Sequence, residues 1–273
     1  MSEVTTLGII GDPVSHSISP AMHNAALRAL AIEATYGRWP TPAAQLPSRV
    51  AALRAPGMVG ANVTLPHKVA VAPLLDRCAA IATYFGAVNT IVREPDGSLT
   101  GYNTDAPAFR DSLLALGLLL PESQAVVLGA GGAARAALWA LREVGCPGIT
   151  VINRTLDNAS RLVQPGEIAL AAADPQAAAA ISAATLLINT TSLGWQPGDA
   201  APTDLALLHP GLFVYDMVYR PTPLLQAARS CGARAADGLD MLVRQAGLAF
   251  ELWFRQPAPL EIMRAAAEAA LRS

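Results

Sequence analysis

Apolar residues recur along the chain in short runs that alternate with longer stretches of helical spacing. Residues 7–10 and residues 125–128 are two such runs, each closed by a glycine. In the stretches between runs, apolar positions three or four residues apart, such as Ala26, Leu27 and Leu30, indicate amphipathic helices. Regular alternation of strands and helices is typical of α/β proteins with parallel sheets. The pattern therefore predicts an α/β fold.

The same patterns give approximate positions for the elements. Strands are predicted at residues 7–10, 36–39, 62–64, 88–92, 99–102, 125–128, 149–152, 168–172, 186–188 and 213–215. Helices are predicted at residues 19–30, 66–82, 104–116 and 239–256, with an alanine-rich helix ending near 144 and a last helix after Pro259. Asp96-Gly97 is a strong hairpin signal between two of these strands. At 273 residues, the chain is long enough for two domains, each with its own core.

Composition narrows the class of protein further. The chain is 52% hydrophobic and 15% charged, with positive mean hydropathy and a formal net charge of −2. No basic block is present, which argues against a nucleic-acid partner. The three cysteines and four histidines have no metal-ligand spacing, so we expect neither a metal site nor a disulfide framework. The N-terminus lacks a secretory pattern, and the most apolar stretch, 168–188, is interrupted by Asp174-Pro175-Gln176. We therefore expect a cytoplasmic protein without a membrane span.

Residues 62–68 combine an amide, a hydroxyl and an amine at one predicted strand-to-helix junction. Val63 and Leu65 alternate with Asn62 and Thr64, so one face can enter a core while the other presents polar groups. Pro66 suits the first turn of a helix, because a proline there loses no intrahelical hydrogen bond. Lys68 would then project from that turn. This surface would suit a small polyhydroxylated molecule.

The glycine-rich segment Gly129-x-Gly131-x-x-Ala134 follows one predicted strand and opens a helix. In that context, Gly129 permits a tight turn, Gly131 lets the backbone approach a pyrophosphate, and Ala134 allows helix and strand to pack closely. The helix N-terminus favours the phosphate charge. The segment predicts a dinucleotide site.

The end of the following strand indicates which dinucleotide is bound. NAD enzymes usually place a carboxylate there, whereas a 2′-phosphate requires positive charge. This chain has Asn153-Arg154-Thr155, and a guanidinium can grip a phosphate with two hydrogen bonds. We therefore expect NADP, with a surface arginine that only covers a helix end as the alternative.

Further polar residues follow the strands of the N-terminal half. Asp105 comes after a hairpin strand and would also suit the start of a helix, where a carboxylate is favoured. Asn89 lies at the preceding strand, and Ser17 and Ser19 follow the first strand. Open α/β sheets bind ligands beyond the carboxyl ends of their strands. These residues are therefore candidate ligand contacts.

Taken together, the polar segments resemble the shikimate dehydrogenase family, in order and over essentially the whole chain. The matching segments are Ser15 to Pro20, Asn62 to Lys68, Ala87 to Thr90, Gly101 to Asp105, Gly129 to Ala134, Asn153 to Thr155, Asn189 to Gly194, Asp216 to Pro221, and Gly238 to Gln245. The resemblance implies a two-domain α/β fold, with a substrate domain at 1–105, a Rossmann domain at 106–237, and C-terminal helices at 238–273 that return to the substrate domain. The implied reaction is the reversible NADPH-dependent reduction of 3-dehydroshikimate to shikimate, a step of chorismate and aromatic amino-acid biosynthesis.

The resemblance also implies a role for each matching residue. Lys68 and Asp105 match the catalytic pair that handles the proton. Residues matching the substrate contacts are Ser17, Ser19, Asn62, Thr64, Asn89, Tyr219 and Gln245. Residues matching the NADP contacts are Gly129, Ala130, Gly131, Gly132, Ala133, Asn153, Arg154, Thr155, Thr191, Met217 and Gly238. A ketone gaining hydride develops an alkoxide, which needs a proton source and a nearby positive charge, and Lys68 can supply both.

One departure from the family leaves alternatives open. Many members carry a second basic residue one turn after the position of Arg154, but here that residue is Asn158, preceded by Asp157, with Arg161 a turn further on. A quinate/shikimate dehydrogenase with relaxed or NAD cofactor use is therefore one alternative. A ligand-sensing paralogue without turnover is another, although it would be expected to lack Lys68 or Asp105. A monomer and a homodimer are both compatible with the sequence.

Overall fold

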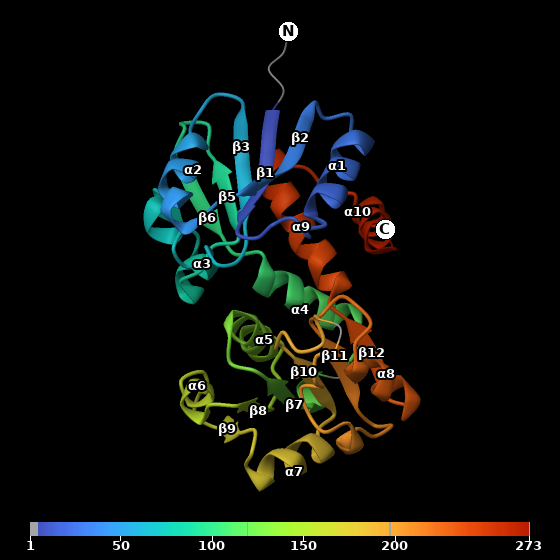
Figure 1. Ribbon diagram of the computed structural model, residues 1–273. Helices are drawn as coiled ribbons and strands as arrows, with labels where there is room; N and C mark the ends of the chain where they lie inside the picture. The colour runs from blue at the N-terminus through green and yellow to red at the C-terminus, as the bar shows by residue number, and fades with distance from the viewer. Residues whose placement is uncertain (1–4, 119, 197, 273) are drawn as a thin grey trace. The chain divides into compact units, whose positions relative to one another are not determined.

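The computed structural model describes residues 5–118, 120–196 and 198–272, which divide into two compact units (Figure 1). The first unit comprises residues up to 108 together with those from 243 onward, and the second comprises residues 109–242. These boundaries lie a few residues beyond the expected ones at 105 and 237, so helices α4 (Asp105–Ala115) and α9 (Leu239–Phe254) each contribute residues to both units.

The first unit is built on a six-stranded mixed sheet in the order β2-β1-β3-β5-β6-β4. Its strands are β1 (Thr5–Gly11), β2 (Ala34–Pro40), β3 (Met58–Val63), β4 (Arg77–Cys78), β5 (Thr90–Arg93) and β6 (Leu99–Tyr102). Strand β1 pairs parallel with β2 and β3, whereas β5 pairs antiparallel with β3 and β6. Consequently β1, β3 and β6 end at the same edge of the sheet at which β5 begins.

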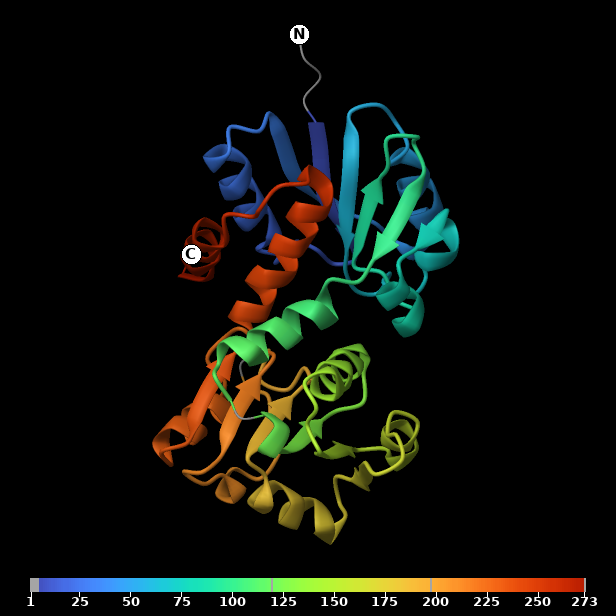
Figure 2. The same cartoon turned by 180° about the vertical axis from the view of Figure 1, so that it is seen from behind.

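Helices cover both faces of this sheet. They are α1 (Ser19–Ala29), α2 (Leu46–Ala52), α3 (Ala80–Phe85), α9 and α10 (Leu260–Arg272), with short 3₁₀ helices η1 (Ala43–Gln45) and η2 (Ala72–Leu74). On one face, Leu46, Val50 and Leu53 of α2 join the buried cluster of Ile10 and Ile91. Helix α9 crosses the opposite face (Figure 2), where the Trp253 indole donates to the Ile91 carbonyl at 2.9 Å.

The second unit holds a fully parallel six-stranded sheet in the order β12-β11-β10-β7-β8-β9. Its strands are β7 (Gln124–Leu128), β8 (Gly148–Asn153), β9 (Ile168–Ala171), β10 (Leu186–Asn189), β11 (Phe213–Asp216) and β12 (Arg234–Asp237). Its helices are α5 (Gly132–Glu143), α6 (Leu156–Ser160), α7 (Pro175–Ala183) and α8 (Pro223–Ser230), with 3₁₀ helices η3 (Leu120–Glu122) and η4 (Leu205–Leu207). This strand order is that of a Rossmann fold, whose switch point lies between β7 and β10.

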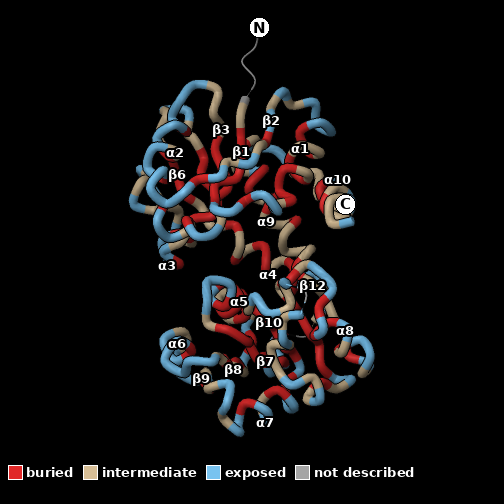
Figure 3. The backbone as a smooth tube through the Cα atoms, viewed as in Figure 1, coloured by how far each residue is buried: buried red, intermediate tan, exposed pale blue. Residues whose placement is uncertain are grey.

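Apolar side chains are buried on both faces of the second sheet, as parallel sheets require. One cluster joins Val127 and Val151 to α5, and a second joins Val126 and Val214 to α7 and α8. Figure 3 shows burial concentrated in the strands of each unit and in the helix faces against them. The predicted two-domain α/β class is therefore confirmed.

The predicted helix over residues 66–82 is wrong. The segment forms a turn, then η2, β4 and α3, and the Leu65–Pro66 peptide bond is cis. The Lys68 carbonyl, which a helix would use locally, instead accepts a hydrogen bond from the Val88 backbone N–H at 2.7 Å. This bond to a distant residue competes with the helical pattern that the local sequence supports.

Within the described residues, no helix is long and apolar enough to cross a membrane. In the same part of the chain, no three His, Cys, Asp or Glu side chains gather in an arrangement that could hold a metal ion.

Candidate active site

Lys68 and Asp105 form an ion pair in the first unit. The Lys68 Nζ lies 2.6 Å from Asp105 Oδ2, and the two side chains are 30% and 20% exposed. Asp105 is the first residue of α4, and its backbone N–H and that of Ala106 donate to Asn103 Oδ1 at 3.1 and 3.3 Å. Lys68 is fixed through its carbonyl, as described above. Backbone hydrogen bonds therefore hold both partners, and their charged groups stay accessible.

Lys68 is also the only lysine among the 19 basic residues of the chain; the other 18 are arginines. An arginine could form the same ion pair, but it does not release a proton at accessible pH. The residue count is thus a sequence signal that favours a chemical role for this amine.

The turn that carries Lys68 is anchored by buried polar contacts. The His67 ring is 1% exposed, with Nε2 2.6 Å from the Thr41 carbonyl oxygen. The His67 N–H donates to the Thr64 carbonyl at 2.9 Å, and the Thr64 N–H donates to the Ile10 carbonyl at 2.8 Å. Thr64 is half-buried and comes directly after β3. Its bond to Ile10 places it at the edge of the sheet where β1 ends.

Asn89 connects this region to the acid. Its Nδ2 donates to Asp105 Oδ1 and to Thr104 Oγ1, both at 2.9 Å. Its Oδ1 accepts from the Thr104 N–H at 2.8 Å and from the Thr90 hydroxyl at 3.1 Å. The side chain is 2% exposed, and these four bonds satisfy its amide completely. A substrate hydroxyl would have to replace one of them.

Asn62 is held in a similar way from the neighbouring strand. Its Oδ1 accepts from the Tyr36 hydroxyl at 2.6 Å, and its Nδ2 donates to the Asn89 carbonyl and to Thr90 Oγ1 at 3.2 and 3.1 Å. Both amide hydrogens are used, so only a lone pair on Oδ1 remains for a ligand. We refer to Tyr36, Asn62, Thr90, Asn89, Thr104 and Asp105 as the Asn89 network.

The two predicted serine contacts lie where the chain enters α1. The Ser17 Oγ accepts the Ser19 N–H at 3.2 Å, and the Arg38 guanidinium holds the Ser17 carbonyl through two bonds of 3.1 and 2.7 Å. Ser19 is 7% exposed and Ser17 is half-buried. Gln245 is a half-buried residue of α9 in the same unit. The structure therefore places the predicted contacts of this unit at strand ends and the segments that join them at one sheet edge, at the start of α1, and on α9.

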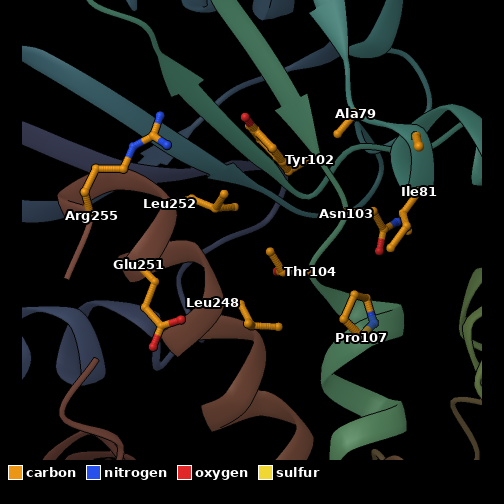
Figure 4. Close-up of a pocket in the computed structure, with 11 residues that line it drawn as sticks. Ala79, Ile81, Tyr102, Asn103, Thr104, Pro107, Leu248, Glu251, Leu252 and Arg255 are labelled. Atoms are coloured by element: carbon orange, nitrogen blue, oxygen red, sulfur yellow. The ribbon is translucent and has the colours of Figure 1, made fainter. Parts of the chain in front are cut away.

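A cavity of about 500 Å³ opens beside the segment that precedes α4 (Figure 4). Tyr102, Asn103, Thr104 and Pro107 line one side of it, and residues of α9, including Leu252, line another. None of the residues predicted to bind substrate or cofactor is among its lining residues.

The glycine-rich loop of the second unit has the geometry that its sequence predicts. Gly129 has φ +105°, and a Cβ there would lie 2.7 Å from Thr190 Oγ1, so only glycine fits. At Gly131 and Gly132, by contrast, an added Cβ would meet nothing within 4 Å, which leaves the backbone open to a ligand. Helix α5 begins at Gly132, and Ala134 is fully buried against the sheet. Ala130 and Ala133 lie in the same loop and first turn.

The residues expected to choose the dinucleotide follow β8. Asn153 Nδ2 donates to the Thr155 carbonyl at 2.9 Å, which shapes this turn. Arg154, Asn158 and Arg161 are exposed. The Arg154 guanidinium is accordingly available to a phosphate.

A second buried network, centred on Asp216, orders the other loops of this unit. Asp216 is fully buried and accepts hydrogen bonds from Asn189 Nδ2 at 2.8 Å, Thr222 Oγ1 at 2.7 Å and the Val218 N–H at 3.1 Å. Burial raises the pKa of Asp216, and these hydrogen bonds oppose the rise. Asn189 Oδ1 in turn accepts the hydroxyl and N–H of Thr191 at 2.7 and 3.0 Å. We call these five residues the Asp216 network.

The Asp216 network thereby fixes the segments that contain Thr191, Met217 and Tyr219. A Cβ on Gly238 would lie 2.2 Å from the Met217 carbonyl oxygen, so this contact also requires glycine. Burial raises the pKa of the half-buried Tyr219, which packs edge-on against Trp195. Tyr219 belongs to the second unit, whereas the other six predicted substrate contacts belong to the first.

Comparison with known proteins identifies the family. The family model described as "Shikimate dehydrogenase substrate binding domain" matches residues 9–91, and "Shikimate 5'-dehydrogenase C-terminal domain" matches residues 238–268. A protein of Symbiobacterium thermophilum named "Shikimate dehydrogenase (NADP(+))" is 46% identical over 97% of this chain and 94% of its own length. The chain belongs to the shikimate dehydrogenase family.

Solved structures of shikimate dehydrogenase family proteins match both units. The enzyme from Thermus thermophilus, in complex with NADP(H) and shikimate, is 40% identical, with a TM-score of 0.88 over 97% of this chain and 99% of its own. Quinate dehydrogenase from Corynebacterium glutamicum, in complex with NAD, is 31% identical, with a TM-score of 0.89 over 97% and 98%. The solved structures similar to this chain therefore include one named for quinate and bound to NAD.

Several residues that support the site were missed from the sequence. Thr90, Thr104 and Tyr36 complete the Asn89 network, and Asp216 and Thr222 complete the other. In the shikimate dehydrogenase pattern, Thr90 and Asp216 lie inside matched segments, which was the available signal, but their partners depend on strand pairing and on loops distant in sequence.

Proposed function

We propose that this chain catalyses the reversible NADPH-dependent reduction of 3-dehydroshikimate to shikimate. The observation that carries the proposal is the ion pair of the only lysine with Asp105, held by Asn89 at the binding edge of the first unit. The Symbiobacterium relative named for this activity, and the Thermus structure with NADP(H) and shikimate, support the choice of substrate and cofactor.

Lys68 supplies the proton in this proposal. As the carbonyl carbon gains hydride, negative charge develops on its oxygen, and the Lys68 ammonium stabilises that charge and transfers a proton to it. Asp105 accepts a hydrogen bond from the amine and keeps it oriented, while its other oxygen is held by Asn89. In the reverse direction, the Lys68 amine accepts the hydroxyl proton of shikimate.

The polar groups near the pair bind the substrate. Ser17 and Ser19 hold the carboxylate, and the remaining contacts of the first unit hold the ring hydroxyls. These remaining contacts are Asn62, Thr64, Asn89 and Gln245. Asn62 can act only as an acceptor, because its amide hydrogens are already used. We expect it to accept a hydrogen bond from a ring hydroxyl.

The second unit suits NADP. The open backbone at Gly131 and Gly132, at the start of a twelve-residue helix, fits a pyrophosphate, and exposed Arg154 fits a 2′-phosphate. Thr191 and Met217 belong to segments ordered by the Asp216 network, and Gly238 packs against Met217. All three would contact the rest of the cofactor. The bound cofactor supplies or takes up the hydride. The domain roles follow: substrate in the first unit and cofactor in the second.

A quinate/shikimate dehydrogenase with relaxed cofactor use is the second candidate. Asn158 follows Arg154 where many members have a second basic residue, and the Corynebacterium structure shows a related fold that binds NAD. Under either reading we expect a cytoplasmic enzyme of chorismate-related metabolism, as a monomer or homodimer.

The test is a set of initial rates with shikimate and with quinate, each against NADP and NAD. Activity confined to shikimate with NADP supports the first proposal. Comparable rates with quinate or NAD support the second, and absence of turnover with all four pairs contradicts both.

A further inference from the structure

The hydrogen bonds that lead from Asp105 through Asn89, Thr90 and Asn62 to Tyr36 each have one possible direction. The Thr104 backbone N–H can only donate, so it fixes Asn89 Oδ1, and the Asp105 carboxylate can only accept, so it fixes Asn89 Nδ2. The Thr90 hydroxyl must then donate to Asn89 Oδ1, at 3.1 Å. The orientation of Asn89 therefore determines the proton position on Thr90.

The same donor-to-acceptor direction continues across the strands to Tyr36 on β2. Because Thr90 Oγ1 donates to Asn89, it accepts from Asn62 Nδ2, at 3.1 Å. Asn62 Oδ1 is thereby turned toward Tyr36, whose hydroxyl must donate to it, at 2.6 Å. Burial raises the pKa of Tyr36 well above its usual value, so the tyrosine keeps the proton that this bond requires.

Strand pairing places Thr90 at the centre of this chain. It lies opposite Asn62 in the antiparallel pair of β3 and β5, which brings the two side chains together on one face of the sheet. Thr90 is fully buried, and no other side chain bonds to both amides, Asn62 and Asn89, among the hydrogen bonds described. Its hydroxyl is the link between them.

We infer that Thr90 is a positioning residue: by donating to Asn89 Oδ1 it adds to the Thr104 N–H in holding the Asn89 amide turned toward Asp105, and Asp105 in turn holds the Lys68 amine in place for proton transfer. The expected effect on kcat rests on the proposed function. The expected effect on the Asn89 side chain does not. Thr90 does not touch the reacting atoms; it acts through Asn89 and Asp105.

The experiment compares two Thr→Val changes on neighbouring strands. Thr90→Val removes the linking hydroxyl, whereas Thr100→Val on β6 removes a buried hydroxyl that has no hydrogen-bond partner within the described part of the chain. For Thr90→Val, we expect kcat to fall about tenfold with KM within about threefold of the parent, because a loss of order one strong hydrogen bond is felt at the catalytic pair. Thr100→Val should keep parental kinetics, and Thr90→Ser should restore kcat to within about twofold.

A second measurement needs no substrate. The side-chain amide protons of Asn89, followed by ¹⁵N NMR on the full chain, should exchange with water at least about tenfold faster in Thr90→Val than in the parent or in Thr100→Val. A purely structural role would lower Tm and leave this exchange and the kcat of the folded enzyme unchanged. If the parent has no activity with shikimate, the proposed function fails, and the amide exchange alone decides the positioning role.

Three results would overturn the inference. They are parental kcat and amide exchange in Thr90→Val, equal losses in Thr90→Val and Thr100→Val, and failure of Thr90→Ser to restore the parental values. If Thr90→Val does not fold, Thr90→Ala takes its place, with Thr100→Ala as the matched control. Asn89 amide exchange that is the same in Thr90→Ala as in the parent would then overturn the inference.

Discussion

Each unit buries a network of asparagine, threonine and aspartate at the ends of its central strands, yet the two networks finish differently. In the Asp216 network, the carboxylate is fully buried and its hydrogen bonds all run to the protein. In the Asn89 network, the last carboxylate is 20% exposed and pairs with an amine that is 30% exposed. The Asp216 network is therefore closed, with its carboxylate buried. The Asn89 network is open, because it ends in an ion pair that solvent can reach.

The difference separates two tasks that similar residues perform. A closed network holds loops together: Asp216 bonds to Asn189 on the neighbouring strand and to Thr222, and the local bonds of Val218 and Thr191 shape the loop that follows each strand. An open network holds a chemical group, because its internal bonds leave one atom free for an outside molecule. Substitutions in the Asp216 network should therefore mainly lower the free energy of unfolding. Substitutions at the exposed end of the Asn89 network should mainly lower turnover.

Lys68→Ala offers the sharpest test of the open network. We expect kcat to fall about 10³-fold with substrate affinity largely retained, because the proton donor is lost and the binding groups remain. Lys68→Arg is the matched variant: it keeps the charge beside Asp105 but does not release a proton, so its kcat should also be low. Steady-state and binding measurements decide this, and near-normal kcat in Lys68→Ala would refute the assignment of Lys68.

Asp216→Leu tests the closed network. Three donors, from Asn189, Thr222 and Val218, would lose their acceptor in a buried site, and we expect a loss of about 3 kcal/mol in the free energy of unfolding. Asp216→Asn keeps the size and one acceptor oxygen and should lose about 1 kcal/mol or less. Urea unfolding of both variants gives the comparison, and equal losses would show that the hydrogen bonds are not what stabilises these loops.

His23 makes the first unit sensitive to acid. It stacks on Tyr36 at 4.3 Å between ring centroids, and burial lowers its pKa from 6.5 to about 3, against a smaller opposing effect of Asn62. The unfolded chain therefore binds a proton below pH 6.5 that the folded chain refuses, so stability present above pH 6.5 is lost as the pH falls toward 3. At a pH of about 5, the loss from this group should be about 2 kcal/mol.

The check is urea unfolding of His23→Phe and of the parent at pH values of about 5 and 7.5. Phenylalanine keeps the stacking and does not titrate, so the variant should lose less stability in acid than the parent does. His16→Phe, at an exposed histidine, controls for the substitution itself. Identical curves for His23→Phe and the parent would contradict the prediction.

Arg154→Ala gives the smallest expected effect and concerns cofactor choice in the second unit. Removing the guanidinium should raise the KM for NADP about tenfold and leave the KM for NAD unchanged, because only NADP carries the 2′-phosphate. Arg161→Ala, just past the end of α6, is the matched control and should have little effect. A larger effect from Arg161 would move the phosphate contact to that residue.

The glycine-rich loop could be predicted in detail because its requirements are local. The conformation of Gly129, the open backbone at Gly131 and the close packing of Ala134 all follow from residues within one strand–turn–helix segment. The helix beginning at Asp105 was predictable for the same reason. A carboxylate and a preceding asparagine suit the first turn of a helix wherever they occur.

The residues that hold the Lys68–Asp105 ion pair could not be predicted in this way. The link through Thr90 exists only because β5 pairs antiparallel with β3 in one register, which no local pattern specifies. The predicted helix from Pro66 failed for a related reason, since the Lys68 carbonyl bonds to Val88, twenty residues on. Similarly, Asp216 gains its role from Asn189, on a neighbouring strand. Local sequence identifies the groups that could react, and distant pairing decides how they are held.

The presence of a single lysine has a practical consequence. Among the side chains, only Lys68 would react with amine-coupling reagents, since every other basic side chain is a guanidinium or an imidazole. An α-amino group reacts with the same reagents, so labelling should be read at the peptide that contains Lys68, where shikimate should slow it in proportion to occupancy. For the same reason, attachment to a solid support through lysine would inactivate the protein, and an introduced surface cysteine would be the better handle.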